Sequence, residues 1–167
     1  MTNDTPAEAL SFTALAGDFC KTIHDIPSLT KEDFTDAMLR LLPRLYITMQ
    51  GYEPLTEPDM DVISTYVDED HYNQARESIA AIMGEDDTYL ETFMEDMKYS
   101  DTPIAASISE SLADIYQDMY NFTMTVRDSE GTLAPQAMDQ MHENFALYWS
   151  KILCNVMRPL NALKYNL

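Results

Sequence analysis

The residues best suited to chemistry lie in the second half of the chain. Asp114 and Tyr116 fall within a Leu-Ala-Asp-Ile-Tyr segment, and His142 precedes Trp149 by two turns of a predicted helix. A carboxylate, a phenol and an imidazole in one groove can transfer protons or bind a metal ion. If the two predicted helices that carry them pack together, these four residues form a candidate catalytic site.

The same residues also have ordinary structural roles, which the sequence favours. An inward-facing His142 is more often a core histidine that is hydrogen-bonded to a carboxylate or carbonyl. An aspartate on a helix, such as Asp114, is usually exposed to solvent, and a tyrosine such as Tyr116 is common at the boundary of a core. No catalytic residue is therefore assigned, and a non-catalytic role is favoured over an enzyme of unknown reaction.

Acidic residues are concentrated in the middle of the chain. Residues 51–101 hold 15 Asp and Glu against Arg76 and Lys98, a net charge of −13 out of −19 for the whole chain. Such a surface repels nucleic acid and anionic membranes and attracts basic proteins. The predicted partner-binding residues are six acids in two runs: Asp68, Glu69, Asp70, Glu85, Asp86 and Asp87.

A metal site in this acidic region is a second alternative to an interaction surface. Asp59 and Asp61, like the two acidic runs, offer the oxygen ligands that Ca²⁺ and Mg²⁺ prefer. None of these stretches has the glycine and distal glutamate of a calcium-binding loop. We therefore expect a solvated acidic surface, with no metal ligand and no cofactor assigned.

Helical periodicity and capping signals predict an all-α fold, an antiparallel bundle of about five helices. N-terminal signals stand at Thr5, Thr30, Asp68 and Ser107, and stop signals at Pro27, Gly51 and Gly84. The predicted helices occupy residues 6–25, 30–51, 68–84, 107–128 and 135–155. The last two form a C-terminal hairpin, and a long acidic connection at 52–67 lacks a helical stripe.

Prolines and apolar residues refine this picture. Pro43 predicts a kink in the second helix, and Pro159 a bend or stop of the last helix near Asn155. Residues 88–97 fit a short helix or a packed irregular segment, and no run alternates as a strand does. The methionines of the apolar stripes are predicted to pack in the core: Met38, Met49, Met119, Met138 and Met141.

Length and cysteine usage favour one cytoplasmic domain. The 167 residues suit a single domain spanning 1–167, and we expect neither a secretory signal nor a membrane span. Cys20 and Cys154 are far apart, without metal-ligand spacing, which is typical of buried thiols in a reducing compartment. The oligomeric state, any substrate and the identity of any partner do not follow from the sequence.

Three segments together resemble a bacterial family, DUF5063, a domain of unknown function. They are Leu41-Leu42-Pro43-Arg44-Leu45-Tyr46, then Ser109-Glu110-Ser111-Leu112-Ala113-Asp114-Ile115-Tyr116, then Phe145-Ala146-Leu147-Tyr148-Trp149. The resemblance covers most of the chain and implies an all-helical cytosolic protein, but no activity. We therefore expect a protein-interaction or adaptor module whose acidic surface lies at 53–101.

Overall fold

The computed structural model describes residues 7–91 and 104–166. Its α-helices are α1 (Ala7–His24), α2 (Lys31–Gln50), α3 (Glu69–Met83), α4 (Ile108–Asp128), α5 (Ala134–Asn144) and α6 (Ser150–Tyr165). Its shorter elements are η1 (Ile26–Ser28), η2 (Gly84–Asp87), β1 (Thr88–Glu91), β2 (Ile104–Ser107) and the π-helical turn η4 (Phe145–Trp149). The predicted all-α class is confirmed, and the predicted cap at Thr5 lies outside the described residues.

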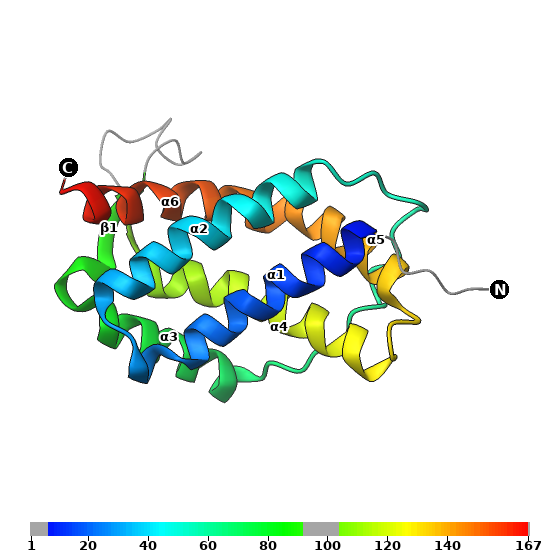
Figure 1. Cartoon of the computed structure of the whole chain (residues 1–167), viewed down its shortest axis with the longest axis horizontal. Coiled ribbons are helices and arrows are strands. Elements are labelled where there is room, and N and C mark those ends of the chain that lie inside the picture. The colour runs from blue at the N-terminus through cyan, green and yellow to red at the C-terminus, as the bar shows by residue number, and fades with distance from the viewer. Residues whose placement is uncertain (1–6, 92–103, 167) are drawn as a thin grey trace.

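The helices form an antiparallel bundle along the long axis of the molecule (Figure 1). α4 packs against α3, α1, α5 and α6, and α2 packs against α1 and α6. A turn at 129–133 reverses the chain between α4 and α5, so the predicted C-terminal hairpin is present. α4 therefore lies at the centre of the bundle, and its polar side chains meet several neighbours.

Three predicted helix starts are confirmed by their capping hydrogen bonds. The side chains of Thr30, Asp68 and Ser107 each accept a bond from the backbone N–H three residues later. Each satisfies one of the N–H groups that a helix leaves unpaired in its first turn. These local signals fix where α2, α3 and α4 begin.

One hydrophobic core runs through the bundle. The five predicted core methionines are all fully buried. Phe12 packs edge-on against Phe122, with ring centroids 5.1 Å apart, and Phe145 packs against Trp149 at 4.7 Å. Cys20 is buried as predicted, but the prediction for Cys154 was wrong, because it lies on the exposed side of α6.

Buried polar side chains hold the connection 52–67 in place. Asp139 accepts hydrogen bonds from the Tyr52 hydroxyl at 2.6 Å, the Leu55 N–H at 3.0 Å and both the N–H and hydroxyl of Thr56. Further along, Gln140, Thr125 and Asn121 bond to the connection's backbone. Backbone groups in a helix or strand bond to other backbone groups. In this connection, side chains of α4 and α5 supply hydrogen-bond partners instead.

A two-stranded antiparallel hairpin corrects the expectation that the chain has no strand. β1 pairs with β2 in a register that sets Thr88 opposite Ser107 and Glu91 opposite Ile104. Arg158 bonds to the Leu90 carbonyl and lies over the Tyr89 ring, which attaches β1 to α6. Strands of four residues are too short to show clear alternation in a sequence. Each strand also depends on a partner that lies on the other side of residues 92–103 in the chain.

The last predicted helix also differs from the structure. It is divided into α5, η4 and α6, and α6 continues through Pro159 to Tyr165. The wider turn at η4 buries both Phe145 and Trp149 and leaves Tyr148, between them in sequence, 48% exposed. Pro43 lies within α2, as predicted, and the kink expected there stays a prediction. Proline costs a helix one hydrogen bond, which core packing on the same helix offsets here.

Candidate functional site

α4 carries two polar clusters on different sides. Asp114 and Asp118 are one helical turn apart and share a side, whereas Tyr116 is two residues from each and faces another neighbour. α3 supplies partners to both clusters, since Tyr72 bonds to Asp114 and the adjacent His71 bonds to Tyr116. The segment containing Asp114 and Tyr116 is therefore the centre of the candidate site.

The first cluster is a pair of partly covered carboxyl groups. The Tyr72 hydroxyl donates to Asp114 Oδ1 at 2.7 Å, and burial raises the pKa of Asp114 despite this bond. Asp118 Oδ2 is buried and has no hydrogen-bond partner within the described part of the chain. Burial, together with the neighbouring Asp114, raises the pKa of Asp118 to about 7. Such a carboxyl group gains or loses its proton near neutral pH.

One aromatic residue of η4, Tyr148, lies near these carboxyl groups, and the next residue, Trp149, is also notable. Burial raises the pKa of Tyr148, and the charges of Asp114 and Asp118 raise it further. Trp149 is fully buried, and its indole N–H also has no partner among the described residues. π-helical turns often occur at functional sites because they redirect side chains, which draws attention to this part of the bundle.

The second cluster joins three helices through one hydroxyl group. Tyr116 Oη lies 2.6 Å from His24 Nε2 and 2.7 Å from His71 Nε2. Tyr116 is fully buried, whereas His24 is exposed at the end of α1. Both histidines border an open cavity of about 210 Å³, together with Pro27, Gln74 and Ser78.

The four candidate catalytic residues occupy four different environments. Asp114 bonds to Tyr72, whereas Tyr116 bonds to the two histidines. His142 is partly exposed and lies beside Tyr52, with ring centroids 6.0 Å apart. Trp149 packs between Phe12 and Phe145. The pocket that the sequence suggested is thus replaced by two separate clusters on α4.

Sequence reasoning did not select His24 or His71. His24 and His71 are 47 residues apart, share no motif and lie on different helices. A signal was nevertheless present, since the chain has only three histidines. Their meeting point on Tyr116 depends on how α1 and α3 pack on α4.

The six predicted partner-binding acids divide into two groups. Asp68 caps α3, Asp86 pairs with Lys31 at 2.7 Å, and Asp87 accepts two bonds from Ser109, both at 2.7 Å. Asp68 and Asp86 are nevertheless exposed, as are the other three, Glu69, Asp70 and Glu85, whereas Asp87 is half-buried. The acidic residues 85–87 belong to the 3₁₀ turn η2, and residues 88–91, predicted to be part of a short helix or an irregular segment, form β1 instead. The rest of that predicted segment, 92–97, lies outside the described residues.

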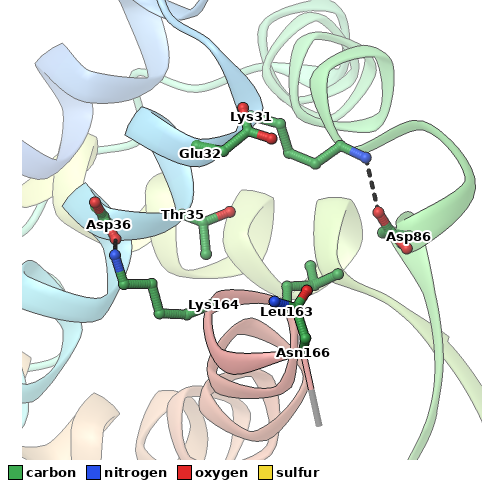
Figure 2. Close-up of a pocket in the computed structure, with 8 residues that line it drawn as sticks. All are labelled: Lys31, Glu32, Thr35, Asp36, Asp86, Leu163, Lys164 and Asn166. Atoms are coloured by element: carbon green, nitrogen blue, oxygen red, sulfur yellow. Dashed lines mark hydrogen bonds and ion pairs between the residues drawn. The ribbon is translucent and has the colours of Figure 1, made fainter.

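A cavity of about 270 Å³ lies beside this acidic turn (Figure 2). Its rim contains two ion pairs, Lys31 with Asp86 and Lys164 with Asp36, the latter at 2.6 Å. Both ammonium groups are thus already paired with carboxylates, so the cavity offers no free positive charge from these lysines. The pairs instead connect η2 and the end of α6 to the start of α2.

Two further observations concern metals and membranes. Across residues 7–91 and 104–166, His, Cys, Asp and Glu do not gather in groups of three or more that could hold a metal ion. Over the same residues, every helix is too short or too polar to cross a membrane.

The family model for DUF5063, a domain of unknown function, matches residues 3–166. The chain belongs to the DUF5063 family. This match confirms the resemblance seen in the sequence and extends it over almost the whole chain. No curated protein matches this DUF5063 chain.

A solved structure shares the fold of this DUF5063 protein. It is the crystal structure of protein BF1032 from Bacteroides fragilis, with 28% sequence identity and a TM-score of 0.81. The match covers 96% of this chain and 94% of the other. The bundle described above is therefore also found in an experimentally determined structure.

Proposed function

We propose that this DUF5063 protein is a protein-interaction module that binds a basic partner through an acidic surface. The observation that carries the proposal is the net charge of −13 within residues 51–101. Of the six acids in the two runs, Glu69, Asp70 and Glu85 are exposed and take no part in the internal bonds described above, so they are the contact residues we assign. Asp68 and Asp86 are exposed as well, but like the half-buried Asp87 they have partners within the fold.

The charge of this surface decides which partners it can attract. Arg76 is the one base in the described part of 51–101, and it already lies 4.0 Å from Glu77 and within reach of Asn73. The field of the acids is thus little compensated locally. Clustered charge of one sign speeds the encounter with a partner of opposite sign, and salt screens this attraction.

Charge-neutral variants test the assignment. Glu69→Gln, Asp70→Asn and Glu85→Gln together remove three charges without touching the internal bonds. The matched control removes three exposed acids elsewhere, Glu8→Gln, Asp33→Asn and Glu130→Gln. Immobilised wild-type chain should retain basic proteins from lysate at about 50 mM salt and release them at high salt. The first variant should lose these proteins and the control should keep them.

Equal retention by both triple variants would contradict the proposal. So would partners that are not basic, or binding that does not respond to salt. Circular dichroism of each variant shows whether the bundle is intact, which separates a lost contact from a lost fold.

A second candidate function is an enzyme that uses Asp118 to transfer a proton. The observation that favours it is the buried carboxyl pair, since a pKa of about 7 for Asp118 suits a general acid or base near neutral pH. Carbon NMR of the aspartate carboxyl groups tests it directly. A titration of Asp118 near pH 4 would remove the physical basis of this candidate.

We also propose that the chain is one domain and acts in the cytoplasm. One core cluster draws residues from all six α-helices, which supports a single folding unit. Cys154 is exposed and unpaired with Cys20, as thiols are in a reducing compartment. A single unfolding transition seen by two probes, and cell fractionation, test these two statements.

A further inference from the structure

Two histidines from different helices aim at one point. His24 Nε2 and His71 Nε2 both lie within 2.7 Å of the Tyr116 hydroxyl oxygen. Tyr120 packs edge-on against the His71 ring, with centroids 4.6 Å apart, and lies 6.1 Å from the His24 ring. The aromatic wall behind the histidines thus holds both imidazoles with their Nε2 atoms together.

Hydrogen bonding alone requires the two imidazoles to play different roles. A tyrosine hydroxyl has one proton to donate, so it donates to one Nε2 and must accept a proton from the other. The two histidines are then held in opposite tautomers. A metal ion in this position accepts the lone pairs of both Nε2 atoms at once, so both rings can adopt the same tautomer.

We propose that His24, His71 and Tyr116 bind a divalent transition-metal ion of the kind that prefers imidazole, such as Zn²⁺. The site needs only two histidines and a phenol, so it does not depend on an acidic cluster. Nitrogen ligands select transition metals over Ca²⁺ and Mg²⁺, which prefer oxygen. The net charge of −19 attracts cations to the chain and disfavours an anionic ligand in the same cavity.

The two imidazole nitrogens are near enough for one ion to bridge them after the rings move. The two Nε2 atoms are at most 5.3 Å apart, the sum of their distances to Tyr116 Oη. A tetrahedral ion at roughly 2.0–2.1 Å from each nitrogen brings them to about 3.4 Å from one another. His24 is exposed at the last residue of α1, so we assign this adjustment to its ring, which contacts Tyr116 and Tyr120 edge-on.

The surroundings suit both the ligands and the open positions of the ion. Tyr116 is fully buried, whereas His24 is exposed and both histidines line the cavity, so an ion can reach the phenol oxygen from solvent. The cavity of about 210 Å³ leaves room for water in the remaining coordination positions.

Co²⁺ and Zn²⁺ titrations of the tag-free full chain test the proposal. We expect one equivalent of Co²⁺ to give the visible absorption bands of a site with nitrogen ligands, and Zn²⁺ to displace it. His24→Ala and His71→Ala should each weaken binding by at least about tenfold. Millimolar Ca²⁺ should not compete.

His142→Ala is the matched control, because His142 is the chain's third histidine and lies beside Tyr52 instead. It should bind Co²⁺ as the wild type does. His24 is exposed, so His24→Ala tests the site without disturbing the core. Tyr116→Phe keeps the buried ring and removes only the oxygen, and it should change the Co²⁺ spectrum.

Several results would overturn the proposal. These are no Co²⁺ or Zn²⁺ binding at millimolar ion, unchanged binding in His24→Ala, or an equal loss in His142→Ala. Competition by Ca²⁺ would also overturn it, because it indicates oxygen ligands on the acidic surface. An unchanged spectrum in Tyr116→Phe would remove the phenol from the ligand set.

Discussion

The Tyr72 hydroxyl donates to Asp114 Oδ1, whereas Asp118, one turn further along α4, has a buried oxygen with no donor in the described structure. The two carboxyl groups therefore differ in how their charge is supported. A charge without a donor in a buried position raises the energy of the folded state. This difference leads to a stability prediction that depends on pH.

Asp118→Asn should stabilise the protein at pH 8 and have little effect at pH 4. The pKa of Asp118 is raised from 3.8 to about 7 in the folded state. As pH rises from about 4 to 7, the unfolded chain loses this proton while the folded chain keeps it, so wild-type stability falls. The neutral variant avoids this loss, which amounts to at most about 4 kcal/mol above pH 7.

Urea denaturation of wild type and variant between pH 4 and pH 8 measures the difference. Asp70→Asn, which removes an exposed acid on α3, is the control. A difference between Asp118→Asn and wild type that stays constant with pH would show that Asp118 is not held in its neutral form.

Asp139→Ala should loosen the connection 52–67. It removes the acceptor of the Tyr52 hydroxyl and of the Leu55 and Thr56 N–H groups, at a cost of about 2 kcal/mol in the free energy of unfolding. Burial acts to raise the pKa of Asp139, but these hydrogen bonds together hold it below its usual value. The carboxylate's contribution is thus present above about pH 4 and lost as pH falls through the lower folded pKa.

Hydrogen exchange measures this effect residue by residue. The Leu55 and Thr56 amides should exchange faster in Asp139→Ala. Amides in the middle of α1 should change only as much as the loss in the global free energy of unfolding accounts for. Gln136→Ala, at an exposed position on α5, is the control. Unchanged exchange at Leu55 would contradict the role given to Asp139.

Asp86 and Asp87 should differ in their effect on stability, although they are neighbours. Asp87→Ala removes both bonds to Ser109 in the first turn of α4 and should cost about 1–2 kcal/mol. Asp86→Ala breaks an exposed pair with Lys31 and should cost less than about 0.5 kcal/mol. Chemical denaturation of the two variants compares them directly. Equal losses in the free energy of unfolding would contradict a stabilising role for the bonds between Asp87 and Ser109.

Alanine at two glycines should have opposite effects. Gly84 ends α3 with φ of 58°, a conformation that strains other residues, so Gly84→Ala should destabilise by about 1–2 kcal/mol. Gly17 lies within α1, and an added methyl there meets nothing within 4 Å. Gly17→Ala should stabilise by about 0.5–1 kcal/mol through helix propensity. Thermal unfolding measures the direction of each change in stability. A change in the same direction for both variants would contradict this prediction.

The sequence predicted the helices well because their signals are local. A cap such as Thr30 or Ser107 and a stripe of buried residues lie within a few positions of one another. The small sheet was missed because β1 and β2 pair across twelve intervening residues and are each four residues long. The rotation of the buried face at η4 was missed because an ideal helical wheel assumes 3.6 residues in every turn, whereas a π-helical turn contains more.

The candidate sites were harder to predict. Asp114 and Tyr116 were selected from one segment of sequence, yet their bonding partners come from α1 and α3. Asp139 and Asn121 looked like ordinary helix residues, because the backbone that they bond to has no pattern of its own. Contacts of this kind depend on packing angles between helices, which hydrophobic periodicity does not specify.

The π-helical turn η4 restricts how the length of the chain can change. An α-helix advances by about 100° per residue, so deletion of one residue within Phe145–Trp149 would rotate all of α6 by that angle relative to α5. Val156 and Leu160 would leave the core, and Arg158 would leave β1. Insertions and deletions should therefore be tolerated in the turn at 129–133 but not between α5 and α6, where the residue count itself determines which side of the last helix is buried.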